Sequence, residues 1–194
     1  MRSEDSLHSA RRPPLTHMHQ MTGLDYDNDE IIQIACFITD AELNLLDAEG
    51  FETVVHQSED RMNAMDDWCR KTHAKSGLTA AVIASDITAE IAAAHLLTYV
   101  KKYVPDRRKA LLAGNSVHAD RAFLRRHPYN QVIDHLHHRI LDVSTIKEAA
   151  RRWSSNDVLK ATPRKKGLHE AKTDILESIE EAKFYRDVFF NPKD

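Results

Sequence analysis

The sequence predicts one α/β domain, with a mixed sheet flanked by helices and a long helix near its C-terminal end. β-rich apolar segments come first, and helical segments then alternate with short buried strands. This order places helices on the faces of a sheet. The length of 194 residues suits one domain with a sizeable core better than two domains.

Composition limits the functional classes. The chain is 42% hydrophobic and 29% charged, as in soluble globular proteins, and no apolar run approaches the roughly 20 residues of a membrane span. The net charge of −3 does not favour avid binding to long nucleic acids, although a metal-loaded pocket could attract a short anionic substrate. Cys36 and Cys69 are the only cysteines, and we expect two reduced thiols in an intracellular protein.

The first half of the chain predicts strands followed by helices. Three β-rich segments joined by short turns suggest an antiparallel meander at the edge of a larger sheet. A helix is expected from Asp60 to Leu78, closed near Gly77, and a second one is ended by Pro105. The three β-rich segments are 30–39, 42–46 and 51–57.

The second half repeats a strand-and-helix plan. A short buried strand ends at Gly114, and a helix runs from about Ala119 to Pro128. A strand at 140–143 precedes a helix in which Thr145 and Glu148 are expected to form a capping box. The last helix is amphipathic, with a stripe formed by Ala171, Ile175, Ile179, Ala182 and Phe189.

Three residues of the second half are candidates for chemistry, because reactive groups in such sheets lie at strand ends or on the helices that follow. Asp120 lies in the first turn of a helix, where a carboxylate either complements the helix dipole or binds a metal ion. His169 and Asp174 lie at the entry of the last helix, a spacing that by itself is typical of surface residues. Together the three would form half of a two-metal phosphodiesterase site, with the histidine deprotonating the attacking water.

Five ordered motifs between Met21 and about Phe190 carry a resemblance to a known family. They are "MTGLDYDNDEIIQIA", "VVHQSEDRMNAMDDWCRKTHAKSGL", "GNSVHADRAFL", "RILDVSTIKEAARRW" and "GLHEAKTDILESIEEAKFYR". The chain is similar to the oligoribonucleases, short-RNA exonucleases of the DEDDh group. The resemblance implies a ribonuclease-H-like fold, a pair of Mg²⁺ or Mn²⁺ ions, a homodimer, and release of 5′-mononucleotides from the 3′ end. It also implies that Asp120 is the third acid of the metal site, His169 the general base and Asp174 the last acid.

The resemblance also implies a substrate site for short single-stranded RNA and dinucleotides. Leu24 would be a wedge beside the terminal bases and Trp68 a stacking partner, since an aromatic face stacks on any base. Core packing is the other interpretation of Trp68, because it shares a helical stripe with Met65. Arginine and hydroxyl groups bind a terminal phosphate. The cap over the 5′ phosphate would be formed by Ser116, Arg139, Ser144 and Thr145.

His138 occupies a position where the family usually has a tyrosine that is donated to the neighbouring protomer's site. A histidine still stacks on a base, but less extensively, so this difference affects affinity more than function. The other interpretation of this histidine and its neighbours His135 and His137 is a solvated helix end.

The family reads Asp-x-Glu directly before Met-Thr-Gly-Leu, whereas this chain has Met18 and Gln20 at those positions. Neither residue replaces a carboxylate as a ligand for a hard cation. The nearby acids Asp25, Asp27 and Asp29 are expected to serve turn chemistry instead. Catalysis by this chain is therefore expected to be crippled.

The segment before Met21 also lacks the apolar strand of the family. It contains Pro13 and Pro14, and proline is excluded from the interior of a central strand. We expect residues 1–20 to be an atypical segment, either disordered or derived from an alternative or misjoined first exon, and residues 21–190 to form the exonuclease domain. The alternative is a genuine chain that has lost activity.

The sequence thus predicts a 3′-to-5′ exoribonuclease that degrades short oligoribonucleotides, with no membrane association. A non-catalytic binder of short RNA or dinucleotides is the alternative, and a structural partner of an active homologue is a third reading. A mitochondrial or a cytoplasmic location is equally compatible with these residues.

Overall fold

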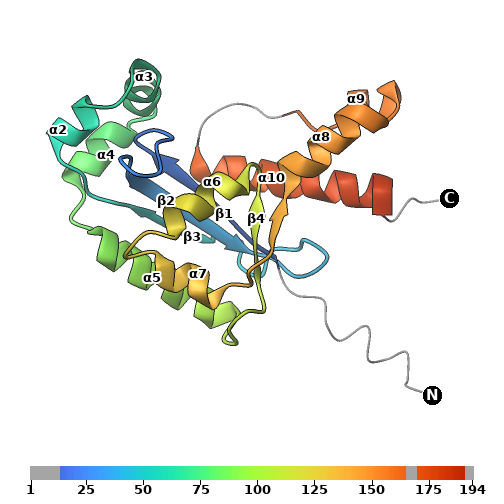
Figure 1. The fold of residues 1–194 in the computed structure, drawn as a ribbon, viewed down its shortest axis with the longest axis horizontal. Helices are drawn as coiled ribbons and strands as arrows, with labels where there is room; N and C mark the ends of the chain where they lie inside the picture. Colours follow the sequence, from blue (N-terminus) through green and yellow to red (C-terminus); the bar gives the residue numbers. More distant parts are fainter. Residues whose placement is uncertain (1–13, 165–169, 191–194) are drawn as a thin grey trace.

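The computed structural model describes residues 14–164 and 170–190, with backbone alone for 14–20. Its centre is a five-stranded sheet in the order β3-β2-β1-β4-β5 (Figure 1). β1, β2 and β3 pair antiparallel, and β1, β4 and β5 pair parallel, so the predicted mixed sheet is confirmed. The strands are β1 (Pro14–Met21), β2 (Ile31–Ile38), β3 (Phe51–Val54), β4 (Leu111–Gly114) and β5 (Ile140–Asp142).

The central strand β1 differs most from the sequence prediction. It pairs with β2 from Leu15 to Met21 and with β4 from Pro14 to Thr16. Pro14 is the first residue of the strand, a position that tolerates proline. The strand pairs through backbone N–H and C=O groups, and all of its residues except proline supply both. The structure thus describes 14–20 as part of a strand, and residues 1–13 lie outside the described residues.

The helices follow the predicted order with additional breaks. The expected helix Asp60–Leu78 is divided because the Asp66 carboxylate caps a new helix, accepting a hydrogen bond from the Cys69 N–H at 2.8 Å. A further short helix follows Gly77, whose φ is +79°. The helices are α2 (Glu59–Asn63), α3 (Asp67–Lys75), α4 (Leu78–Ala84), α5 (Ala89–Tyr103), α6 (Val117–Leu124), α7 (Asn130–His135), α8 (Val143–Trp153), α9 (Asn156–Ala161), α10 (Ala171–Tyr185) and the π-helix η1 (Arg186–Phe190).

The segment 42–46, which was predicted as a strand, forms a turn with one isolated bridge, between Thr39 and Leu45. Asp40 is responsible, since its Oδ1 accepts hydrogen bonds from the N–H groups of Glu42 and Asn44 at 2.8 and 2.9 Å. A side chain that binds nearby backbone groups in this way competes with strand pairing. The three-stranded meander exists, but β1 rather than this segment completes it.

Helix α8 also begins differently from the prediction. Its N-cap is Asp142, whose Oδ1 accepts from the Ser144 N–H at 3.0 Å, so Thr145 is not the capping residue. Glu148 does not complete a capping box and instead forms ion pairs with two arginines of the following turn.

Helices cover both faces of the sheet, as Figure 1 shows. On β2, Ile34, Cys36 and Ile38 pack in one buried cluster with α5, α6 and α7. The alternate residues Ala35 and Phe37 pack in a second cluster with α8 and α10, as expected from the two-residue period of a strand. The second cluster includes four residues of the predicted C-terminal stripe, namely Ala171, Ile175, Ile179 and Ala182.

A β-bulge in β2 directs one side chain of the strand into a third buried cluster. Gln20 pairs with Gln33 and Met21 with Ile31, so Ile32 is the extra residue of β2. Ile32 is fully buried and packs against α2, α3 and α4. Bulges re-aim side chains in this way and are frequent beside functional sites.

Both cysteines are free and buried. Within residues 14–164 and 170–190, no single helix is long and apolar enough to cross a membrane, and only α4 and α5 taken together, bent by 105°, reach such a composition.

The loop between β1 and β2 is built around the carboxylate of Asp29. This carboxylate accepts hydrogen bonds from the Thr22 hydroxyl at 2.7 Å and the Asp25 N–H at 2.8 Å, and it pairs with the Arg61 guanidinium at 2.7 Å. A Cβ at Gly23 would collide with the same carboxylate, which explains the glycine before Leu24. The predicted turn role of Asp29 is thus confirmed.

We expect Asp29→Asn to destabilise the protein by about 1–3 kcal/mol, because hydrogen bonds and an ion pair to a charged group are lost together. Urea unfolding would measure this change, and amide hydrogen exchange at Asp25 and Glu30 should accelerate with it. The matched control is Asp27→Asn in the same turn, where an exposed acid should change the free energy of unfolding by less than about 0.5 kcal/mol. Equal effects of the two changes would contradict this account of the loop.

Candidate functional site

The parallel strands bring three candidate segments to one edge of the sheet. β1, β4 and β5 run in the same direction, so their carboxyl ends lie together. Leu24 follows β1, Ser116 follows β4 and Ser144 follows β5. Ligands of open α/β sheets bind outside the carboxyl ends of the strands, which makes this edge the candidate site.

Ser116 and Ser144 lie in contact, as the resemblance implied. Their hydroxyl oxygens are 3.2 Å apart, and the Ser116 N–H donates to the Ser144 Oγ at 3.0 Å. Asp142 holds both backbones, since its Oδ1 accepts the N–H groups of Ser116 and Ser144 at 3.0 Å each, and its Oδ2 lies 3.3 Å from the His118 Nδ1. The carboxylate already uses these N–H groups, so an anion would depend on hydroxyl groups and on cations.

The structure does not bring all four predicted cap residues together. Thr145 is exposed in the first turn of α8, next to Ser144. Arg139 is also exposed but precedes β5, whose three residues span about 10 Å and separate it from Ser144. His138, beside Arg139, is exposed and lies against His137, with ring centroids 4.3 Å apart.

Leu24 and Trp68 are large apolar side chains on the surface, 73% and 61% exposed. Core packing of Trp68 is thereby excluded. Trp68 belongs to α3, and His73 of the same helix places its Nε2 3.2 Å from the Met21 carbonyl, at the carboxyl end of β1. Leu24 and Trp68 thus belong to elements that meet at the carboxyl end of β1.

Asp120 and Asp174 are buried, 7% and 8% exposed. Each lies in the first turn of its helix, α6 and α10, and both helices pack against β1. Carboxylates rarely lie so deep without a partner or a metal ion. His169 lies outside the described residues.

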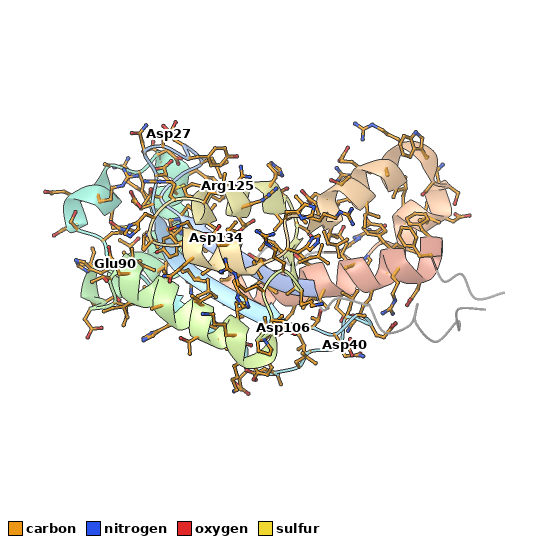
Figure 2. All side chains as sticks on the ribbon, turned by 60° about the horizontal axis from the view of Figure 1, so that its bottom comes forward. Asp27, Asp40, Glu90, Asp106, Arg125 and Asp134 are labelled. Carbon is orange, nitrogen blue, oxygen red and sulfur yellow. The ribbon has the colours of Figure 1, made fainter. Side chains whose placement is uncertain are left out.

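The residues of the chain do not fit the two-metal site that the family resemblance implies. Positions 18 and 20 of β1 pair with Ala35 and Gln33 of β2, and Ala35 belongs to the cluster under α10, the helix of Asp174. Positions 18 and 20 are thus register positions of the central strand, and they carry Met and Gln. Among the described residues, no group of three or more His, Cys, Asp or Glu side chains could hold a metal ion. The acids labelled in Figure 2 are likewise spread over the molecule, with Asp27 far from Asp40 and Asp106.

Two acids that the sequence analysis passed over organise this site. Asp142 fixes the backbones of Ser116 and Ser144. The sequence feature that could have indicated this role is an acid directly before a predicted helix, where it can cap the helix. Glu181 is 1% exposed in α10, where it breaks the apolar pattern of a buried helix face. Buried ionisable residues of this kind are usually paired and often serve function.

The family described as Exonuclease matches residues 21–182. Over 174 residues the chain is 47% identical to the mitochondrial oligoribonuclease of Mus musculus and 45% identical to that of Homo sapiens, covering 90% of this chain and 72% of each relative. The oligoribonuclease of Vibrio vulnificus is 46% identical over 171 residues, 88% of this chain and 92% of that protein.

Solved structures show the fold. E. coli exonuclease I in complex with a dT13 oligonucleotide matches with a TM-score of 0.67 at 17% sequence identity, over 91% of this chain. The chain spans 41% of that exonuclease I chain. This likeness confirms the predicted ribonuclease-H-like fold.

Identity of this extent across most of the length of both proteins, together with the matching exonuclease domain, shows that the chain belongs to the oligoribonuclease family of 3′-to-5′ exoribonucleases.

Proposed function

We propose that the chain binds short single-stranded RNA at the carboxyl edge of its sheet and releases 5′-mononucleotides from the 3′ end. The contact between Ser116 and Ser144 beside a buried Asp120 is the observation that supports this proposal most directly. Exonuclease I, which shares the fold, has been solved with single-stranded DNA, and the exonuclease family depends on divalent metal ions. Mg²⁺ or Mn²⁺ is the ion that we propose for this chain, with Asp120 and Asp174 as its remaining carboxylate ligands.

The residues proposed to bind RNA are present in the sequence, with His138 in place of the family's usual tyrosine. Leu24 is proposed to separate the terminal bases, and the exposed ring of Trp68 to stack on one of them. The hydroxyls of Ser116, Ser144 and Thr145 are proposed to bind the 5′ phosphate, with Arg139 of the partner subunit supplying the positive charge. His169 is proposed to take the proton from the attacking water.

The hydrolytic half is incomplete, because Asp120 and Asp174 are two carboxylates where the family has four acids. We expect slow hydrolysis by this chain for that reason. The same observation favours the second candidate function, a non-catalytic binder of short RNA or dinucleotides, since every proposed RNA-binding position except that of His138 matches the family pattern.

We expect Met18→Asp/Gln20→Glu to release mononucleotide from a 5′-labelled RNA dinucleotide with Mn²⁺ at least about a hundredfold faster than the unchanged chain. The physical reason is that charge stabilisation at metal sites contributes several kcal/mol to the transition state. Adding Asp120→Ala to the double change is the control and should remove the gain. Equal rates for the double variant and the unchanged chain would contradict the assigned acids. Tight dinucleotide binding without cleavage by either protein would favour the non-catalytic function.

We expect Trp68→Leu to weaken dinucleotide binding by about 5–150-fold in Kd, because stacking of one base on an aromatic side chain contributes about 1–3 kcal/mol. Calorimetric titration without metal would measure it, so that cleavage does not interfere. Trp68→Phe keeps an aromatic face and is the matched control, with a smaller loss expected. If Leu and Phe gave the same affinity as Trp, stacking at this position would be excluded.

A homodimer is proposed on the basis of an exposed apolar surface. Trp153 and Phe190 are 81% and 66% exposed at the edge of a hollow of 440 Å³ between α8 and η1. Exposed apolar patches of this kind mark interfaces. Thr145 lines the same hollow, so a second protomer seated there would lie beside the phosphate cap. In such a dimer, His138 and Arg139 of one protomer are proposed to contribute to the RNA-binding site of the neighbouring protomer.

We expect Trp153→Glu to convert the dimer to a monomer in sedimentation velocity, because it places a charge in the apolar contact. Trp68→Glu puts the same change on an exposed tryptophan outside this surface and should leave the dimer intact. A monomeric unchanged chain, or a dimer that survives Trp153→Glu, would contradict the proposed interface.

We further propose a mitochondrial location, because the relatives from mouse, human and Saccharomyces cerevisiae are named as mitochondrial proteins. Cell fractionation would distinguish it from a cytoplasmic location.

A further inference from the structure

A buried carboxylate joins three elements behind the proposed phosphate cap. Glu181 of α10 is 1% exposed. It accepts hydrogen bonds from the Asn115 Nδ2 at 2.9 Å and the Tyr185 hydroxyl at 3.1 Å, and it pairs with the Lys147 Nζ at 2.8 Å. We call these four residues the Glu181 network.

The network keeps its central carboxylate charged. Burial alone would raise the pKa of Glu181, but hydrogen bonds from Asn115 and Lys147 outweigh it and hold the pKa below its usual range. Burial, together with the Glu181 charge, raises the pKa of the Tyr185 hydroxyl to about 12, so this group remains a donor at neutral pH. An ionised carboxylate only accepts hydrogen bonds, and each of its three partners is therefore fixed as a donor.

The network holds the two segments that present the cap hydroxyls. Asn115 directly precedes Ser116 in the turn between β4 and α6, and Lys147 lies three residues, about one helical turn, after Ser144 in α8. Within the described residues, the Asn115 Oδ1 is buried and has no hydrogen-bond partner. The Asn115 amide is therefore oriented through its bond to Glu181. Because Glu181 is buried behind these segments, it is placed to act on RNA only through them.

We propose that Glu181 is a positioning residue for recognition of the 5′ phosphate. It ties the Asn115–Ser116 turn, and α8 one turn after Ser144, to the helix of Asp174, and so fixes the spacing of the two serine hydroxyls. This inference rests on the proposed function, in which those hydroxyls bind the phosphate.

The test compares two RNA dinucleotides that differ only in a 5′ phosphate or a 5′ hydroxyl, titrated without metal. The readout is the ratio of their Kd values, the phosphate preference. We expect Glu181→Gln to lower this preference about tenfold, the loss expected for one charge-assisted hydrogen bond. Affinity for the 5′-hydroxyl dinucleotide should stay within about twofold, because Leu24 and Trp68 lie on other elements. Glu180→Gln, which removes an exposed acid of the same helix, is the matched control and should keep the preference.

Each outcome decides one claim. If the unchanged chain prefers the 5′ phosphate and Glu181→Gln keeps that preference, or loses both affinities equally, the positioning role is wrong while the phosphate cap stands. If the unchanged chain shows no preference, the cap itself fails and the inference falls with it. Should Glu181→Gln not fold, Asn115→Ala breaks the same hydrogen bond without altering the buried charge, and the same loss of preference is expected.

Discussion

The pairing of β1 on both of its edges is the interaction on which the rest of the structure depends. β1 joins the antiparallel half of the sheet, through β2, to the parallel half, through β4. It also sets the direction in which the site faces, because its carboxyl end lies at the same edge as those of β4 and β5. Helices α6 and α10, with Asp120 and Asp174, pack against it. Without this strand, nothing would hold the antiparallel half of the sheet, the parallel half and the two helices in fixed positions relative to one another.

Recognition and hydrolysis are separable in this molecule. Of the residues proposed to bind RNA, Leu24, Trp68 and the cap hydroxyls follow the strands or lie on α3. Local devices such as the Asp29 carboxylate, the Asp142 cap and the Glu181 network fix these elements. Hydrolysis is proposed to require acids at positions 18 and 20 of β1, which carry Met and Gln in this chain. The strand keeps its place in the sheet through backbone hydrogen bonds, which do not depend on the side chains at these two positions.

Carboxylates that are paired across distant segments recur around this site, and one of them, Glu181, is buried. Asp29, Asp142 and Glu181 each bind groups from two or more segments that are distant in the sequence. Removing a partner of the buried Glu181 charge costs more than the pair contributes, so this network specifies geometry as well as stability. The phosphate cap is consequently determined by residues that do not touch the phosphate in the proposed complex.

The sequence by itself determined the α/β class, the apolar stripe of α10, the family and the loss of two acids, because these depend on local periodicity and on ordered motifs. It could not determine that 14–20 forms the central strand, since pairing with β2 and β4 overrides a poor local pattern and Pro14 falls at a tolerated end. Nor could it predict the helix break at Asp66, which depends on capping geometry, or exclude core packing of Trp68, which depends on the exposure of that side chain. Only the tertiary structure decided that Ser116 and Ser144 meet and that Arg139 does not join them within one protomer, because strand direction and the length of β5 fix which residues share an edge.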